Sequence, residues 1–271
     1  MRWPRRFFNF YLDASIHVAL SVCCCYLLTV NFMKVSTNWQ LVAFLFFGTI
    51  ICYNFIKYGV EAKKYLLVSN PYHKVIQVFS FLSGLCAAYF FLFLNRRLQI
   101  SIVFLAFLSI LYAVPFLEKN KNLRSYGGLK VFLVALVWAG CTVYLPAMDD
   151  MVSDFDSTVP ILLLQRFLLV LVLILPFEIR DLKFDDKELR TLPQRLGVAN
   201  TKKLGYGLLV VFLLFTFLND QATALEWCYR VMVAITLAIF LYFTHEERPR
   251  YYSQFWVESV PILSLLGVSF Y

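Results

Sequence analysis

The feature that most restricts the fold of this chain is a series of apolar stretches, each about 20 residues long, which is the length a helix needs to cross a bilayer. We identify nine of them in the 271 residues, at approximately 11–33, 39–57, 74–94, 98–117, 129–147, 159–177, 204–219, 226–244 and 254–270. The mean hydropathy of +0.69 and the hydrophobic content of 61% lie outside the range of soluble domains. The sequence therefore predicts a multi-pass membrane protein.

The spans are expected to be helices, because backbone in contact with lipid must satisfy its own hydrogen bonds. The alternation typical of barrel strands is absent. We expect an all-α, polytopic membrane protein with nine transmembrane helices, forming one domain over residues 1–271. No polar stretch is long enough to form a separate soluble domain.

The lysines and arginines predict the orientation of these helices, because basic residues favour cytoplasmic loops. With the N-terminus in the cytoplasm, twenty of the 25 basic residues lie on the cytoplasmic side. They are Arg2, Arg5, Arg6, Lys57, Lys63, Lys64, Lys74, Lys119, Lys121, Arg124, Lys130, Arg180, Lys183, Lys187, Arg190, Arg195, Lys202, Lys203, Arg248 and Arg250. Cytoplasmic loops then fall at about 57–74, 118–130 and 178–203. The net charge of +8 is one-sided and gives no reason to expect nucleic acid as a partner.

Charge is concentrated in residues 177–197, FEIRDLKFDDKELRTLPQRLG, where ten of 21 side chains are charged. If the sixth span continues as a helix, Glu178, Asp181 and Asp185 fall within an arc of about 60° on one face. Carboxylates gathered in this way suit Mg²⁺ that also binds substrate phosphates. Basic neighbours offer an alternative, because Arg180, Lys183, Lys187 and Arg190 would neutralise the acids without a metal ion.

The same stretch resembles the second aspartate motif of the UbiA-type intramembrane prenyltransferases. Asp181 and Asp185 match its Asp-x-x-x-Asp element, and Thr191, Leu192, Arg195, Leu196 and Gly197 match the residues that close the motif. The resemblance implies nine transmembrane helices, catalytic and Mg²⁺-binding roles for Asp181 and Asp185, and Glu178 as a further metal ligand. It also implies an isoprenoid diphosphate that ionises, and a lipophilic acceptor that attacks the allylic cation. The segment between Asp185 and Thr191 is about two residues shorter than usual and lacks the customary Gly.

The first aspartate motif of that family is degenerate in this chain. The corresponding stretch, NFIKYGVEA, keeps Asn54 but has Phe55, Tyr58 and Ala62 where aspartates are expected. Acids are then predicted on one side of the pocket only. Lys57 would contact the diphosphate directly in place of the missing metal ligands. It could equally pair with Glu61 or extend toward the lipid headgroups.

Two further parts of the sequence supply candidate substrate-binding residues. The resemblance extends to LYAVPFLEKNKNLRSYGGLK, where Tyr112, Arg124 and Lys130 would face the diphosphate, although an ordinary basic inner loop would look similar. On the first span, Asp13 and His17 are four residues apart and are expected to share one helix face. His17 is then either a substrate contact or a packing residue beside an interfacial Asp13.

Arg166 lies inside the sixth span, where a charged residue needs a partner. We expect it to have a structural role, either extending outward or pairing with Glu258.

The most favoured function is transfer of a prenyl group from an isoprenoid diphosphate to a lipophilic acceptor, in a multi-pass protein of the plasma or inner membrane. The alternative is a non-catalytic protein of the same fold that binds an isoprenoid lipid or acts as a scaffold, which the degenerate first motif favours. Transport has less support, because no two spans are broken by Gly or Pro in matching halves. Acceptor, prenyl length and oligomeric state are not predicted by the sequence.

Overall fold

The computed structural model describes residues 3–59, 70–113, 127–150, 158–185, 189–219 and 222–269, and its regular elements are all helices. In chain order they are α1 (Trp3–Asp13), α2 (Ile16–Met33), α3 (Trp39–Asn54), η1 (Phe55–Gly59), α4 (Pro71–Leu92), α5 (Arg96–Ala113), α6 (Gly127–Ala139), η4 (Gly140–Tyr144), α7 (Leu145–Asp149), α8 (Thr158–Asp181), α9 (Leu192–Phe217), α10 (Ala224–Phe243), η6 (Tyr252–Val257) and α11 (Val260–Ser269). Elements marked η are π-helical turns.

Seven helices in the described ranges are long and apolar enough to cross a membrane. They are α2, α3 with η1, α4, α6 through α7, α8, α9 and α10. The expected all-helical, multi-pass architecture is confirmed. The expected spans at 98–117 and 254–270 are not among the seven. The first corresponds to α5, which runs into residues outside the described ranges, and the second is divided between η6 and α11 by a turn at Glu258 and Ser259.

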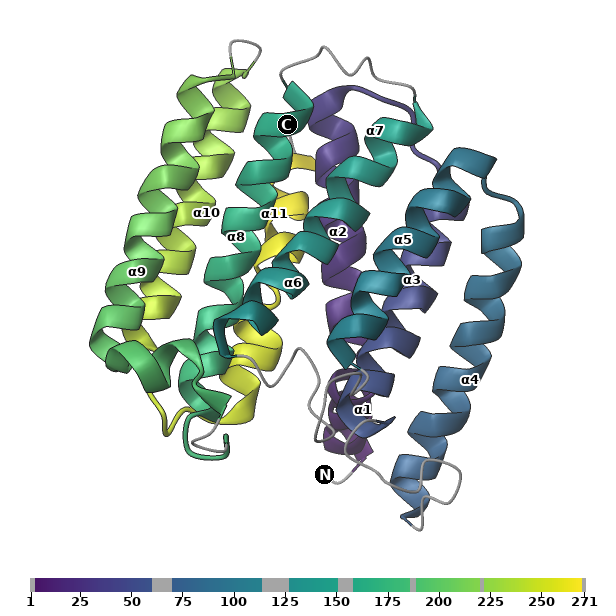
Figure 1. The fold of residues 1–271 in the computed structure, drawn as a ribbon, viewed down its shortest axis with the longest axis horizontal. Coiled ribbons are helices and arrows are strands. Elements are labelled where there is room, and N and C mark those ends of the chain that lie inside the picture. The colour runs from purple at the N-terminus through teal and green to yellow at the C-terminus, as the bar shows by residue number, and fades with distance from the viewer. Residues whose placement is uncertain are drawn as a thin grey trace.

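Helices α2 and α8 form the centre of the bundle. In Figure 1, α9 and α10 lie to one side of them and α3, α4 and α5 to the other, with α6 and α11 between. The apolar window of α2 is 67% buried and that of α8 is 56% buried, whereas the value is 22% for α3, α4 and α9. α8 contributes Val170 and Leu171 to one hydrophobic core, and Leu169 and Leu173 to a second. It therefore joins the two halves of the bundle.

The first predicted span is interrupted, which corrects the placing of Asp13 and His17 on one helix face. α1 ends at Asp13 and α2 begins at Ile16, with Ser15 between them in the left-handed region at φ 61°. The chain changes direction here, because left-handed backbone cannot continue a right-handed helix. Asp13 contacts Arg250 and Tyr72, whereas His17 packs elsewhere.

The predicted cytoplasmic loop at 178–203 is shorter in the structure, because α9 already begins at Leu192. The backbone N–H of Thr191 donates to Gln194 Oε1 at 3.0 Å, which is one half of a capping box, and Pro193 occupies the first turn, where a missing N–H is tolerated. Gly197, at φ 77°, divides α9 into a short first part and a long second part. The motif residues Thr191 to Gly197 therefore form the first, short part of α9, beside the end of α8.

Candidate functional site

A cavity of about 410 Å³ lies between α3 with η1, α6, α8 and the segment around η6. Its volume is within the range of about 300–1,000 Å³ that is usual for small-molecule sites. The polar and charged side chains that line it include Lys57, Lys130, Glu178, Arg180, Asp181, Gln254 and Glu258. The apolar lining includes Ile56, Val131, Val134, Val137, Trp138, Val170, Leu173, Ile174 and Phe177.

The charged residues lie at one end of the cavity. Lys130 is in the first turn of α6 and Glu178 in the last turn of α8, so both belong to the same end of this helix pair. Trp138 and Val170 lie eight residues further into the bundle on those helices, a distance of about 12 Å. The cavity thus has a charged entrance and an apolar interior, which suits an amphiphile with a charged head.

The three acids predicted as metal ligands are each held by a basic side chain. Lys130 Nζ lies 2.5 Å from Glu178 Oε1 and 3.9 Å from Asp185 Oδ2. Asp181 Oδ1 lies 2.6 Å from Arg180 Nη2. α8 ends at Asp181, and residues 182–185 form a turn in which the N–H groups of Phe184 and Asp185 both donate to the Asp181 carbonyl, so Asp185 lies beyond the helix.

These contacts decide how well the acids fit a divalent cation. Their oxygens are the ligands that Mg²⁺ prefers, and Glu178 Oε2 is buried without a hydrogen-bond partner. Among the described residues, however, no three His, Cys, Asp or Glu side chains converge as a metal group. A cation could therefore bind these carboxylates only after Lys130 and Arg180 had released them.

Residues of the degenerate first motif donate hydrogen bonds to the carbonyl groups at the C-terminal end of α1. Its last carbonyls would otherwise lack partners, as at any helix C-terminus. Lys57 Nζ lies 3.4 Å from the Leu12 carbonyl, and the Tyr58 hydroxyl donates to the Asp13 carbonyl at 3.1 Å. The Asn54 amide donates to the Ala14 carbonyl at 3.1 Å. Side chains of the degenerate motif thus stabilise the bend between α1 and α2.

Asn54 and Lys57 differ in their access to the cavity. Asn54 is buried, accepts from Ser15 Oγ, donates to Ser80 Oγ, and does not line the cavity. Lys57 does line it, although its Nζ also donates to Ser15 Oγ at 2.9 Å. The position of Lys57 is therefore compatible with a ligand contact, while the amide of Asn54 is engaged by the protein.

The other predicted substrate contacts lie in different parts of the structure, and not all of them are near the cavity. Lys130 lies at the entrance, as described above. His17 is buried and bonds the Tyr11 hydroxyl at 2.6 Å and the Phe255 carbonyl at 3.0 Å, so it joins α2 to the C-terminal segment. Tyr112 is in α5 near the edge of the described residues, and its side chain is outside them, as is all of Arg124.

Sequence reasoning missed several polar residues of the cavity, Gln254 and Glu258 among them. Glu258 does not pair with Arg166; it interacts electrostatically with Lys57 and Arg180. Acids are therefore present on more than one cavity wall, which corrects the prediction that they occupy one side only. The signal was visible in the sequence, since Glu258 is the only acid in the apolar stretch 254–270.

The chain has the fold of UbiA homologues of known structure, as the sequence motif indicated. A UbiA homologue from Archaeoglobus fulgidus bound to Cd²⁺ has a TM-score of 0.63 at 12% identity, covering 95% of this chain and 99% of that one. A structure of a UbiA homologue from that organism bound to GPP and Mg²⁺ has a TM-score of 0.60 at 11% identity, covering 95% and 98%.

A structure concerning digeranylgeranylglyceryl phosphate synthase has a TM-score of 0.57 at 16% identity and covers 97% of this chain and 99% of that one. At these identities the likeness establishes the fold alone. No protein-family model and no curated protein matches the sequence.

Proposed function

We propose that the cavity binds an isoprenoid diphosphate and that the protein transfers the prenyl group to a lipophilic acceptor within the membrane. The observation that carries this proposal is the amphiphilic cavity, with Lys57, Lys130 and Arg180 at its entrance and apolar walls beyond them. The Archaeoglobus fulgidus homologue with the same fold, bound to GPP and Mg²⁺, supports this ligand class.

The basic residues at the entrance would bind the diphosphate and the walls would enclose the chain. Lys and Arg contacts to phosphate are charge-assisted and stronger than neutral hydrogen bonds. Tyr53, Trp138 and Phe177 line the cavity and offer ring faces to a cationic carbon. The bond between the allylic carbon and the diphosphate oxygen breaks, and the diphosphate leaves with the electron pair. The acceptor then bonds to that carbon and loses a proton, for which Glu258 is our candidate base.

Glu178, Asp181 and Asp185 are the residues that would hold Mg²⁺ in this proposal. A divalent cation there would supply positive charge that neutralises the departing diphosphate. Lys130 and Arg180 form ion pairs with Glu178 and Asp181. An incoming diphosphate would attract both basic side chains. The acids would thereby become available, so ligand and metal ion should bind together.

This coupling gives a first prediction. With purified protein in neutral detergent, Mg²⁺ alone should give little thermal stabilisation, whereas Mg²⁺ with geranyl diphosphate should raise the melting temperature beyond the effect of the diphosphate alone. Asp181→Asn should remove the Mg²⁺-dependent part. Pyrophosphate release with an added acceptor should require Mg²⁺ and fall in the same variant, while the exposed control Glu247→Gln should match the parent protein.

The second candidate function is binding of an isoprenoid lipid without catalysis. The ion pairs of the acids favour it, because Lys130 and Arg180 offset two of the three negative charges without a metal ion. In that case the diphosphate binds, no pyrophosphate appears at any Mg²⁺ concentration, and Asp181→Asn leaves binding unchanged. This combination of results would replace the enzyme proposal.

The proposed membrane arrangement has nine helices, a cytoplasmic N-terminus and cytoplasmic loops at about 57–74, 118–130 and 178–203. Lys183 follows the end of α8, and Arg97 lies at the start of α5; both are exposed. In a cysteine-free background, Lys183→Cys should react with an impermeant thiol reagent only from the cytoplasmic side and Arg97→Cys only from the other side. Labelling of both positions from one side would contradict the arrangement.

A further inference from the structure

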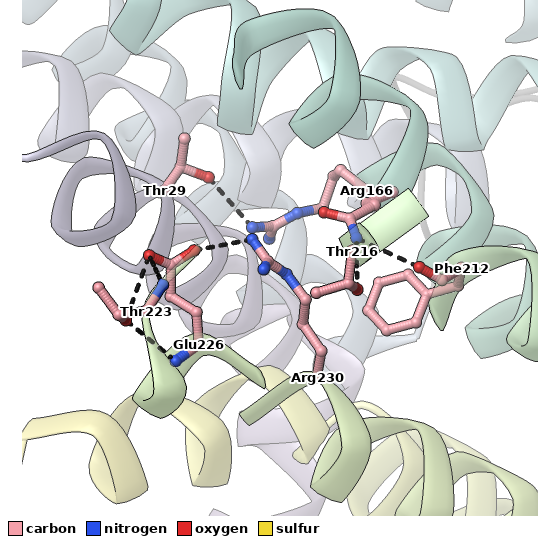
Figure 2. A network of polar contacts seen from close by, with 8 residues as sticks. Thr29, Arg166, Phe212, Thr216, Thr223, Glu226 and Arg230 are labelled. Carbon is pink, nitrogen blue, oxygen red and sulfur yellow. Dashed lines mark hydrogen bonds and ion pairs between the residues drawn. The ribbon is translucent and has the colours of Figure 1, made fainter. Parts of the chain in front are cut away.

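Two buried arginines lie at the end of the bundle opposite the cavity entrance. Arg166 of α8 is 7% exposed and Arg230 of α10 is 1% exposed. Figure 2 shows both side chains extending into the same region between α2, α8 and α10, and both interact electrostatically with Tyr229. Arg166 is twelve residues from Glu178 along α8, about 18 Å. This pair is therefore separate from the cavity and from the proposed function.

The described residues supply one carboxylate for these two cations. Arg230 Nη2 donates to Glu226 Oε2 at 2.8 Å, and Glu226 is itself 6% exposed. Within the described ranges the contacts of Arg166 are with neutral groups: its Nη2 donates to the Thr29 hydroxyl at 3.0 Å, and the thiol of Cys25 lies beside it. The cluster thus carries one positive charge in excess within the described part of the chain.

The polar residues next to the arginines add no charge. Gln165 Nε2 donates to the Phe212 carbonyl at 3.2 Å and to the Thr216 hydroxyl at 3.1 Å, so its amide is directed toward α9. The excess positive charge of the arginine pair is therefore not balanced by the described residues.

Each guanidinium also keeps a nitrogen without a hydrogen-bond partner. Arg166 Nη1 and Arg230 Nη1 are both shielded from solvent and have no such partner among the described residues. Arginine stays protonated in proteins, so these groups cannot discard the charge by losing a proton. The ring of Phe32 lies 5.6 Å from Arg230 Cζ, which offsets part of the cost of burial but accepts no hydrogen bond from Nη1 in the plane of the guanidinium.

We propose that Arg166 and Arg230 form an anion site that binds a phosphate group, either free phosphate or the headgroup of a membrane lipid. A buried charge is costly unless it is paired and hydrogen-bonded. Phosphate oxygens match the fork of a guanidinium, and one anion between the two arginines would receive both Nη1 groups. The bound anion would join α2, α8 and α10 at this end of the bundle.

The test is a melting curve of the purified protein in neutral detergent, followed by tryptophan fluorescence at constant ionic strength. Inorganic phosphate replacing a bulky organic anion should raise the melting temperature saturably, by roughly 5–10 °C at about a hundredfold excess over the dissociation constant. Arg166→Gln should abolish this shift. Without phosphate the variant should melt at or above the temperature of the parent protein, because an uncompensated buried charge has been removed.

Control variants test for a general defect of the protein, and a comparison of additives identifies the source of the phosphate. Arg97→Gln, at an exposed arginine, should keep the full shift, and Arg166→Lys should keep part of it. A shift with inorganic phosphate supports a free anion. A shift with micromolar phosphatidylglycerol, but not with phosphatidylcholine or inorganic phosphate, supports a lipid headgroup. A melting temperature of the parent protein that responds to none of these additions overturns the proposal, whether or not the variants fold.

Discussion

Replacing Lys130 with methionine is expected to lower the free energy of unfolding by about 3–5 kcal/mol, the usual cost of removing one partner of a buried ion pair. Glu178 is 2% exposed and its Oε1 lies 2.5 Å from Lys130 Nζ, so the variant leaves a buried carboxylate without its cation. Asp185 loses a neighbouring charge at 3.9 Å as well. Denaturant-induced unfolding in detergent at neutral pH measures the difference.

A second variant shows whether the ion pair is the cause. Lys130→Met with Glu178→Gln should recover most of the lost stability, because both charges are then absent. Lys203→Met, at an exposed lysine of α9, is the control and should change stability by less than about 0.5 kcal/mol. A single variant as stable as the parent protein would mean that the Lys130–Glu178 contact does not hold α6 against α8.

Lys57→Met is expected to weaken binding of a prenyl diphosphate about ten- to a hundredfold, because a charge-assisted contact contributes roughly 1.5–3 kcal/mol. Binding of the corresponding prenyl alcohol should stay nearly unchanged, since the apolar walls supply its contacts. Titration of both ligands against the parent protein and the variant gives the comparison.

The alcohol is the necessary control, because Lys57 also contacts Ser15 and the Leu12 carbonyl at the end of α1. Equal losses for both ligands would mean that the variant disturbs the bend between α1 and α2 and not the diphosphate. Lys183→Met, at an exposed lysine outside the cavity lining, should alter the affinity for either ligand by less than about twofold, as is usual for surface substitutions. No loss of affinity for either ligand would mean that Lys57 only bonds the end of α1 and does not contact the diphosphate.

The helical architecture was predictable because each apolar stretch carries its own signal in consecutive residues. The break at Ser15 was not, since Asn54 of α3, far along the chain, accepts from Ser15 Oγ and donates to the Ala14 carbonyl at the bend. A serine in that conformation has no local sequence signature comparable to that of glycine. The assumed common face of Asp13 and His17 failed for this reason.

The candidate site was predictable only in part of its residues and not in their contacts. Glu178, Asp181, Lys130 and Lys57 line one cavity, whereas Asp185, Asn54 and His17 are not among its lining residues. The pairing of Glu178 with Lys130 joins α8 to α6, and no spacing rule within α8 indicates it. Glu258 was recognisable as an unusual charge in an apolar stretch, yet its neighbours depend on how α11 and η6 pack against the remaining helices.

The most direct measurement is an experimental structure of the protein with geranyl diphosphate bound. The proposal predicts phosphate oxygens within about 4 Å of Lys57, Lys130 and Arg180 nitrogens, the limit for an ion pair. The prenyl chain should extend past Trp138 and Val170. A diphosphate bound elsewhere, or a cavity in which Lys130 and Arg180 keep their carboxylate partners and no diphosphate is present at saturating ligand, would contradict it.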